Sequence, residues 1–416
     1  MNLIYIFFAL IIVLQISRRR FDFLSIAAVS FVLYTSNCIT GRVWIEGGRL
    51  GTYYQSNIIP LTYMLIICQM LIIILSMHIS FINGKAKWSR SIIQEESLGY
   101  EEYSEAEHTH FYWDVLLIFS VFEFIYTIFF QIGILSFFSY TRKNDLYEMT
   151  GVLYSLAVWG SVLCFMYGIQ KGKKVFSIIS MILILVTVIS GSRAYLATAL
   201  VGYIVIRAKK IKKVKVSNRR MIVLGIIAFF FLLFYKNIYS EVRALDFGAV
   251  YKIITSPETY ANILDINEFR ITTSIYNYVV EEGFRLPVGD SIARLVSIIP
   301  FINNVIPTSY SLRFSSIAMN DFFGASYGLA NSFWAEIYAM GGILLLMIVT
   351  GIWLHFIKWY NNFINGKAKM SPFALTIAAY CSFYIHRLDW LQVWGCIKSV
   401  LVFYLIWLAI NRIRVK

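Results

Sequence analysis

The chain has 416 residues, of which 59% are hydrophobic and only 14% are charged, and its formal net charge is +14. This composition excludes an ordinary soluble domain, in which about a quarter of the residues are charged. Stretches of about 20 apolar residues cross a bilayer as helices, because lipid offers the backbone no hydrogen-bond partners. The sequence therefore predicts an all-α, polytopic membrane protein.

The first apolar stretch has no basic start, and three arginines follow it instead of a small-residue cleavage site. We interpret it as an uncleaved anchor whose N-terminus faces outward, and not as a signal peptide. Hydropathy predicts about eleven transmembrane helices along the chain. They lie near residues 2–17, 22–39, 57–82, 111–138, 150–170, 174–190, 194–207, 221–239, 333–357, 372–388 and 392–411.

The distribution of basic residues supports this count, because loops rich in Lys and Arg stay in the cytoplasm. With eleven spans, the basic clusters near residues 18–20, 85–90, 171–174, 207–220, 358–369 and 412–416 all fall on the inner side. The C-terminus is then cytoplasmic and the N-terminus periplasmic. Most basic residues outside these clusters are arginines, whose planar fork suits phosphate and carboxylate oxygens.

A single charge, Arg193, lies within the apolar stretch Val175–Ile206. Lysines before this stretch and the basic run after it both belong in the cytoplasm, so the number of crossings must be even. At about 1.5 Å per residue the stretch is too long for one crossing and slightly short for two. We expect Gly191, Ser192 and Arg193 to form a tight outward turn with Arg193 at the level of lipid phosphates. Alternatively, Arg193 extends to the head groups only to escape the apolar layer.

The hydrophilic stretch Ser240–Ser332 is predicted to be one large periplasmic loop. It holds six basic residues, five of them Arg, and nine acidic ones, so a nonspecific anion trap is disfavoured. Arginines at defined positions with carboxylates nearby suit a phosphorylated, hydroxyl-rich ligand. A solvated loop of mixed charge is the alternative. The stretch divides the chain into residues 1–239, with eight spans, the loop 240–332, and residues 333–416, with three spans.

Two short amphipathic helices are predicted in this loop. The segment "FRITTSIYNYVVEEG" places Ile275 on an apolar face and Ser274 and Asn277 on a polar face, and we expect it to lie on the membrane and to end at Gly283. The segment "GDSIARLVSIIP" carries Arg294, and we expect Asp290 or Ser291 to cap its N-terminus.

The motifs "ISGSRAYLATAL", "VGDSIARLVSIIP" and "GLANSFWAEIYAMGG", in this order, resemble those of the Wzy-type O-antigen polymerases, the oligosaccharide repeat unit polymerase family. In that family a Gly-Ser-Arg turn, a Gly-x-Ser and Ile-Pro loop, and a Gly/Ser/Glu/Gly-rich entry into a late span recur. The resemblance covers roughly residues 175–345. It implies a GT-C-like arrangement of helices in the bacterial inner membrane.

The resemblance also implies a reaction in which a growing glycan leaves undecaprenyl pyrophosphate and is transferred to another lipid-linked repeat unit. Arginines can stabilise the pyrophosphate leaving group, and neither a metal nor another cofactor is expected, because no Asp-x-Asp, HExxH or P-loop motif is present. A chain-length regulator is an expected partner, and no nucleic acid is. The substrate-binding candidates are Arg193, Arg270, Arg285, Arg294, Arg313, Arg387 and Tyr338.

An acceptor hydroxyl would react faster with a base beside it, and the two catalytic candidates are Glu336 and His386. Glu336 opens a span on the outer side next to aromatic residues that suit sugar faces, although an acid in the first turn of a helix is also favoured by the helix dipole. His386 and Arg387 lie at the outward turn between the last two spans, where a polar interfacial turn is the alternative.

Two other functions stay open. An O-antigen ligase of the same superfamily would transfer the glycan to a lipid A core. A lipid-linked oligosaccharide flippase or other secondary transporter would show related halves or charges within several spans. We see no such halves, and the single large outer loop favours an enzyme.

Overall fold

The computed structural model describes residues 1–18, 21–46, 52–94, 108–139, 150–210, 246–257, 268–299, 331–365 and 372–413, with a few isolated positions between them. The candidate Arg313 and most of the predicted span 221–239 lie outside the described residues. The chain forms two compact units. One comprises Met1–Leu75, Ser256–Asn365 and Tyr380–Lys398, and the other comprises Ser76–Thr255, Gly366–Ala379 and Ser399–Lys416.

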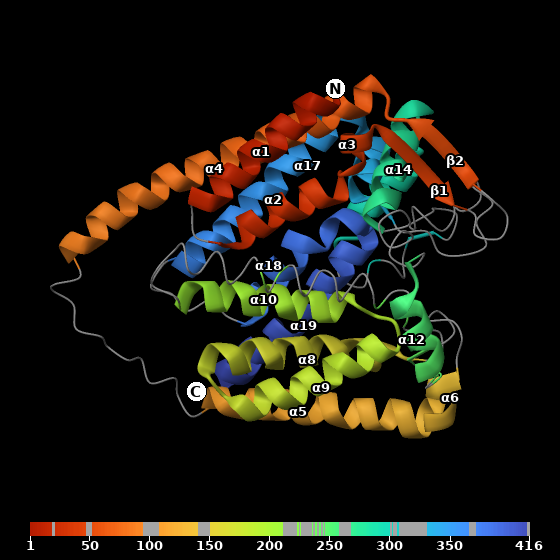
Figure 1. Cartoon of the computed structure of the whole chain (residues 1–416). Helices are drawn as coiled ribbons and strands as arrows, with labels where there is room; N and C mark the ends of the chain where they lie inside the picture. Colours follow the sequence, from red (N-terminus) through yellow and green to blue (C-terminus); the bar gives the residue numbers. More distant parts are fainter. Residues whose placement is uncertain are drawn as a thin grey trace. The chain divides into compact units, whose positions relative to one another are not determined.

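The first unit consists of helices and one small sheet. Helix α2 packs against α1, α14 and α17 (Figure 1), and a short 3-10 turn, η5, contacts α2, α14 and α17. The elements are α1 (Asn2–Arg18), α2 (Phe23–Tyr34), α3 (Asn37–Thr40), β1 (Arg42–Glu46), β2 (Thr52–Asn57), α4 (Pro60–Gln94), α14 (Glu268–Glu281), α15 (Val288–Val296), α17 (Phe333–Asn365), η5 (Ile385–Arg387) and α19 (Trp390–Ile413), with α4 and α19 continuing into the second unit.

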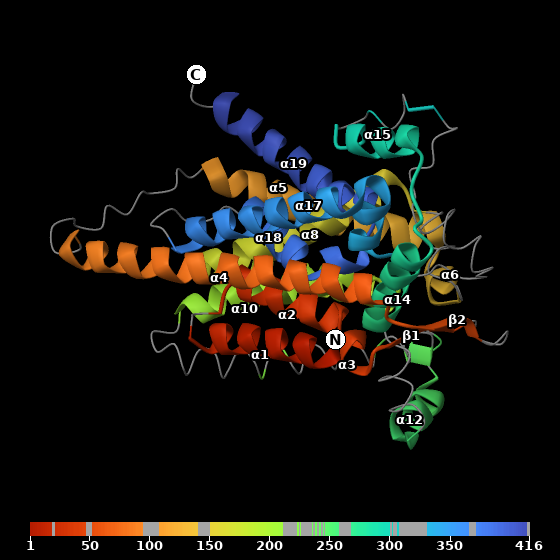
Figure 2. The ribbon, with the colours of Figure 1, turned by 90° about the horizontal axis from the view of Figure 1, so that it is seen from above.

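Strands β1 and β2 form an antiparallel hairpin that the sequence analysis did not predict. Arg42 pairs with Asn57 and Trp44 with Gln55, and β1 lies against α14. Val43 and Ile45 alternate with more exposed residues and are fully buried, as expected for a strand with one face on a core. The hairpin projects beside α14 at one end of the unit (Figure 2).

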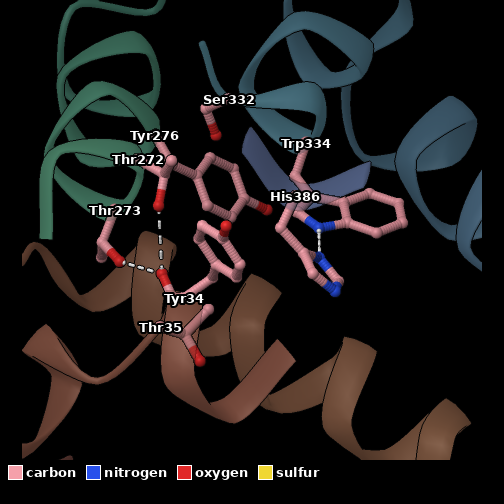
Figure 3. A pocket seen from close by; sticks show the side chains of 8 residues that line it. All are labelled: Tyr34, Thr35, Thr272, Thr273, Tyr276, Ser332, Trp334 and His386. Carbon is pink, nitrogen blue, oxygen red and sulfur yellow. Dashed lines mark hydrogen bonds between the residues drawn. The ribbon is translucent and has the colours of Figure 1, made fainter. Parts of the chain in front are cut away.

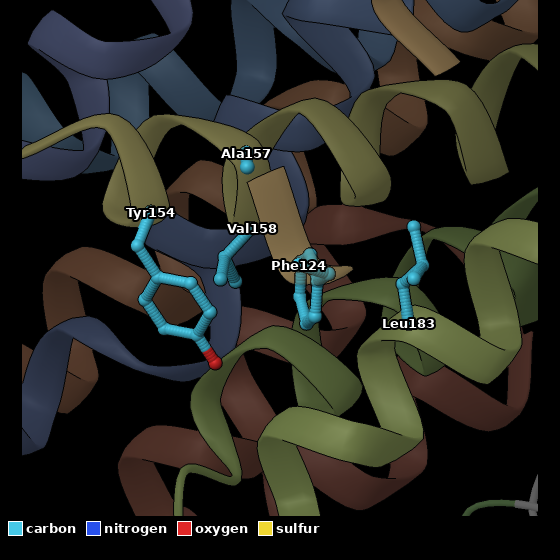
Figure 4. Packing of buried hydrophobic residues seen from close by; sticks show 5 residues of the cluster. All are labelled: Phe124, Tyr154, Ala157, Val158 and Leu183. Atoms are coloured by element: carbon cyan, nitrogen blue, oxygen red, sulfur yellow. The ribbon is translucent and has the colours of Figure 1, made fainter. Parts of the chain in front are cut away.

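The second unit is helical, and α8 lies at its centre. Helices α5, α9 and α10 all pack against α8, and Phe124, Tyr154, Ala157, Val158 and Leu183 form a buried apolar cluster (Figure 4). The elements are α5 (His108–Ile125), the π-helical segment η2 (Tyr126–Ile132), α6 (Ile134–Ser139), α8 (Val152–Lys171), α9 (Lys174–Ile189), α10 (Ala194–Lys210) and α12 (Phe247–Thr255), and α18 (Pro372–Phe383) belongs mostly to this unit.

The predicted helical hairpin around Arg193 is confirmed as a hairpin. Helix α9 ends at Ile189 and α10 begins at Ala194. Gly191 adopts φ 92°, and the Ser192 amide donates to the Thr187 carbonyl at 2.9 Å. Glycine permits this left-handed turn, as the sequence predicted. The outward direction of the turn stays a prediction.

Within the described residues, five helices are long and apolar enough to cross a membrane by length and composition, and they indicate a membrane protein. These segments are Pro60–Ser80, His110–Ile132, Val152–Lys171, Phe333–Asn361 and Trp390–Ile410. The described chain also contains shorter apolar helices of 10–17 residues, namely α1, α2, α9, α18 and residues Ala194–Ala208 of α10. The mostly helical fold is therefore as expected, whereas the count of eleven spans and the single outer loop stay predictions.

Candidate functional site

Helix α17 is broken close to its start, and this break organises the polar residues of the first unit. Gly341 and Gly342 have non-helical backbone angles, with φ 66° at Gly342. The carbonyls of Tyr338 and Ala339 accept from the Arg285 Nη1 and from the Leu286 amide, at 3.2 and 2.9 Å. A broken helix at membrane depth must find such partners for the carbonyls that it frees. The segment before α15 is therefore fixed to the break.

Arg285 and Tyr338, both predicted to bind substrate, lie together at this break. The guanidinium carbon of Arg285 is 4.2 Å from the centroid of the Tyr338 ring. Tyr338 is buried, whereas Arg285 is exposed. Arg285 Nη1 donates to the carbonyls of Tyr338 and Phe284. Within the described residues, Nε and Nη2 of Arg285 have no hydrogen-bond partner. The side chain is thus held in place, with Nη2 close to Gly342, while two of its nitrogens keep their hydrogen-bonding capacity for an anion.

Arg294 and Glu336 form a completely buried ion pair between α15 and α17. Arg294 Nε lies 2.8 Å from Glu336 Oε1, and both side chains are 0% exposed. Glu336 Oε2 accepts from the Trp390 amide at 2.6 Å, and the Trp390 indole donates to the Arg294 carbonyl at 2.6 Å. Arg294 Nη1 donates to the Asp290 carbonyl at 3.3 Å. Within the described part of the chain, Arg294 Nη2 is buried without a partner.

This pair fixes α15, because separating two buried charges leaves each of them unpaired. The pair also decides whether Glu336 can reach a substrate. Both carboxylate oxygens accept hydrogen bonds, from Arg294 and from the Trp390 amide, so neither oxygen is available to a substrate in this arrangement. A general base must reach the proton that it removes. Glu336 could act as a base only after α15 moves away from α17.

The predicted cap of α15 is wrong. The helix begins at Val288 with Pro287 as its N-cap, and no side chain caps it. Asp290 lies inside the first turn, and Ser291 Oγ donates to the Pro287 carbonyl at 3.2 Å. Proline has φ restricted near the value it shows here, −53°, so it can start the helix without a polar cap. An acid at Asp290 is still favoured by the dipole of the first turn.

His386, the second catalytic candidate, is buried in the turn between α18 and α19. Its Nδ1 accepts from the Trp334 indole at 2.9 Å. Because an indole N–H can only donate, the neutral imidazole must carry its proton on Nε2, which lies 3.0 Å from Ser30 Oγ. Burial lowers the pKa of His386 to about 3, since a charged ring would lose its hydration. His386 is therefore neutral, and both of its nitrogens are engaged.

A cavity of about 10 Å³ lies beside His386 (Figure 3), and its volume suits a single water molecule. Thr272 and Thr273 reach its wall from α14, where both hydroxyls donate to the Tyr34 carbonyl. No sugar ring fits in this space. The lining residues are Tyr34, Thr35, Thr272, Thr273, Tyr276, Ser332, Trp334 and His386.

The remaining candidates occupy separate places. The Arg270 guanidinium carbon lies 4.7 Å from the Trp44 ring centroid, and Arg387 donates to the Tyr384 hydroxyl at 2.8 Å. Arg193 belongs to the second unit, and its place with respect to Glu336 stays a prediction. Arg313 lies outside the described residues.

The prediction that the polar face of α14 is exposed is also wrong. Residues 272–280 are all buried, and the polar side chains bond to neighbouring elements instead of water. Ser274 Oγ donates to the Trp44 carbonyl at 3.0 Å, and Asn277 Oδ1 accepts from the Ile59 amide at 3.0 Å. The sequence showed a polar face, but not that the β-hairpin would cover it.

The sequence analysis missed a capping box at the start of α19, although its signal was present. In "DWLQ", Asp389 Oδ1 accepts from the Gln392 amide at 2.7 Å, and Gln392 Oε1 accepts from the Asp389 amide at 3.3 Å. Asn331 Nδ2 donates to Asp389 Oδ2 at 3.0 Å, which ties the start of α17 to α19. No sequence signal indicates that the Trp390 amide binds Glu336.

Among the residues that the structure describes, no group of three or more His, Cys, Asp and Glu side chains could hold a metal ion. Comparisons of the chain with protein-family models, with curated proteins and with solved structures find no match. The site is thus defined by its geometry: an exposed arginine at a helix break, a buried ion pair beside it, and a neutral buried histidine on the same helix unit.

Proposed function

We propose that the chain is a Wzy-type polymerase, which joins undecaprenyl-pyrophosphate-linked repeat units at the periplasmic face of the bacterial inner membrane. The observation that carries the proposal is the contact of Arg294 with Glu336 and Trp390. It joins three segments that lie far apart in the sequence, two of which carry candidates chosen for this chemistry. Arg285 and Tyr338 lie on the same two segments and also touch.

In the proposed reaction, the hydroxyl oxygen of the acceptor repeat unit attacks the anomeric carbon of the donor glycan. The bond from that carbon to the pyrophosphate oxygen breaks, and its electron pair leaves with undecaprenyl pyrophosphate. The hydroxyl proton passes to a base. A pyrophosphate leaving group gains most from fixed positive charge, so arginines carry the largest part of the catalysis.

Arg285 binds the pyrophosphate first in this proposal, because the residue is exposed and its side chain is already held by Tyr338. Opening of α15 then exposes Arg294 and Glu336 together. Arg294, whose Nη2 is unpartnered within the described residues, turns to the pyrophosphate, and Glu336 accepts the proton. His386 is the second candidate for the base. Arg193, Arg270, Arg313 and Arg387 are proposed as further contacts to the lipid-linked substrates.

The test is a cell-free polymerisation assay. Membranes that contain the full chain receive purified undecaprenyl-pyrophosphate-linked repeat unit, without nucleotide or added metal, and the products are separated by size. A ladder of longer glycans on the lipid carrier is expected. Transfer of single units to added lipid A core would instead identify a ligase.

The variants Glu336→Gln and Arg285→Ala sharpen this assay. Removal of a general base or of one donor to a developing anion reduces rates by about 100-fold or more, so both variants should leave single repeat units while the protein stays in the membrane. Glu282→Gln, an exposed carboxylate on the same loop, is the matched control and should form the full ladder. Long chains from Glu336→Gln and Arg285→Ala would contradict the proposed roles.

A secondary transporter is the second candidate, and the break in α17 favours it. Transporters place substrate at discontinuous membrane helices, and α17 is interrupted at Gly341 and Gly342 within an apolar stretch long enough to span. In vesicles, a transporter would move the lipid-linked repeat unit between leaflets without lengthening the glycan. The polymerase lengthens the glycan even in detergent, where no leaflets exist.

A further inference from the structure

Helix α15 is amphipathic in the reverse of the usual sense. Its polar side chains face the protein: Arg294 and Ser297 are 0% exposed. Its large aliphatic side chains face outward, since Val288 is 75%, Ile292 54% and Leu295 43% exposed. A surface helix in water has its apolar stripe on the protein and its polar face in solvent.

The outward stripe continues past the end of the helix and is accompanied by a groove. Val296 and Ile299 are also exposed, at 37% and 54%. A cavity of about 320 Å³ lies along this side, lined by one face of α15, including Ile292 and Val296, and by Ile302, Ile306 and Pro307. This volume falls within the range of about 300–1,000 Å³ of small-molecule sites.

The composition of the stripe indicates a hydrocarbon and not a protein as its occupant. Protein interfaces are enriched in aromatic residues, Met and Arg, whereas the described stripe and groove contain only Val, Ile, Leu, Pro, Ala and Gly. The face has no hydrogen-bonding side chain with which to orient a polar partner. Lipid chains need none.

The attachment of α15 places the stripe beside membrane-spanning helices. The Arg294–Glu336 pair fixes α15 to α17, and the Lys398 ammonium of α19 donates to the Ser297 carbonyl. Both partners belong to helices long and apolar enough to span a membrane. Just after its break, α17 exposes Leu344 at 74% and Ile343 at 49%, so the helix to which α15 is fixed also presents an aliphatic surface suited to lipid.

We infer that the outward face of α15 is immersed in the bilayer, and that its groove binds one acyl chain of a membrane phospholipid. The helix does not lie in the aqueous periplasm, and the buried ion pair compensates the polar face that would otherwise meet lipid. This inference does not depend on the proposed enzymatic activity.

Photocrosslinking tests the immersion. The full chain carrying Ile292→p-benzoylphenylalanine is reconstituted in vesicles of phosphatidylethanolamine and phosphatidylglycerol, irradiated and weighed by mass spectrometry. A mass increase of one phospholipid is expected. Glu282→p-benzoylphenylalanine, at an exposed position after α14, is the control and should show at least fivefold less adduct. Cross-links from position 292 to a peptide of the same chain or of a second copy, or equal adduct at both positions, would overturn the inference.

Native mass spectrometry tests the groove separately. Protein purified in mild detergent should retain one phospholipid per chain. Val296→Arg, which places a charge in the groove, should reduce the retained lipid at least fivefold, whereas Val288→Arg, on the stripe but outside the groove lining, should retain it. Both variants are checked for folding by their elution volume. Equal retention by the two variants, or none by the unaltered chain, would show that the groove holds no acyl chain.

Discussion

Helices α14 and α15 come from the same hydrophilic stretch and are both predicted to be amphipathic, yet they differ in which of their faces is buried. Residues 272–280 of α14 are enclosed on every side, and its polar groups bond to α2 and to the β-hairpin. In α15 the polar side is enclosed and the aliphatic side is exposed. A hydrophobic pattern therefore defines two faces of a helix, but the neighbouring elements decide which face is buried.

The two helices differ energetically because the buried polar groups of α14 are neutral, whereas the central one of α15 is charged. In α14 they are neutral and bond mainly to backbone groups, as Thr273 does with the Tyr34 carbonyl. In α15 the central one is a charge, and it needs an opposite charge at 2.8 Å. A neutral hydrogen bond contributes about 1 kcal/mol, whereas breaking a buried ion pair from one side costs several times more. We expect the position of α15 in the fold to depend on this one ion pair, and the position of α14 to depend on many hydrogen bonds.

The largest effect should come from Glu336→Ala, which leaves Arg294 buried without its carboxylate. We expect a loss of about 3–5 kcal/mol in the free energy of unfolding, as for other buried pairs cut on one side. Thermal unfolding in detergent measures this loss. The double variant Arg294→Met/Glu336→Leu removes both charges and should recover most of it. If the double variant is no more stable than Glu336→Ala, the pair does not fix α15 as described.

The next largest loss in the free energy of unfolding should come from acidification, because it protonates His386, which contacts α14 in the folded chain. Burial lowers the pKa of His386 to about 3, from about 6.5 in an unfolded chain. Between these values the unfolded state binds the additional proton, so stability is complete above about pH 6.5 and falls as the pH decreases. By pH 5 the loss attributable to His386 should be about 2 kcal/mol, at about 1.4 kcal/mol per pH unit.

The comparison of the unaltered chain with His386→Gln isolates this residue from the carboxylates. Glutamine does not titrate, so the difference in unfolding midpoint between the two proteins should narrow as the pH falls from 7 to 5. Parallel curves would mean that His386 is already protonated or is exposed in the folded state.

Much of the fold was predictable from the sequence, because apolar stretches and glycine turns act locally. The hairpin at Gly191 follows from one glycine between two apolar helices and two basic flanks. The Asp389 cap was equally readable from "DWLQ". Each of these features depends on residues within a few positions of one another.

The candidate site was predictable in its residues but not in its connections. Arg294, Glu336 and Arg285 were chosen for their chemistry, but nothing in the sequence pairs Arg294 with Glu336 or assigns Trp390 to the second carboxylate oxygen. Those contacts form between segments far apart in the chain. The same limit explains the error about α14, whose polar face was predicted correctly but assigned to water.

On α14, Asn277→Ala should reduce the free energy of unfolding by about 1–2 kcal/mol, less than removing one partner of the ion pair. The Asn277 side chain is 0% exposed, and its Oδ1 accepts from the Ile59 amide, so the alanine variant leaves that partly buried amide without its acceptor. Thermal unfolding measures the loss, and faster hydrogen exchange at Ile59 would locate it. Ser56→Ala, which removes an exposed hydroxyl contact with Glu281, is the control with little expected change.

The smallest change in the free energy of unfolding should come from a substitution on the aliphatic side of α15. Ile292→Ser alters a side chain that is 54% exposed, and Ile275→Ser makes the same change on α14, where Ile275 is 0% exposed. In detergent we expect the first variant to unfold within about 0.5 kcal/mol of the unaltered chain, because substitutions at exposed sites rarely change stability further. The second should lose at least about 2 kcal/mol, because it removes buried methyl groups and encloses a hydroxyl. Equal losses would mean that the outward face of α15 is covered by protein after all, and the contrast between the two helices would then rest on their polar groups alone.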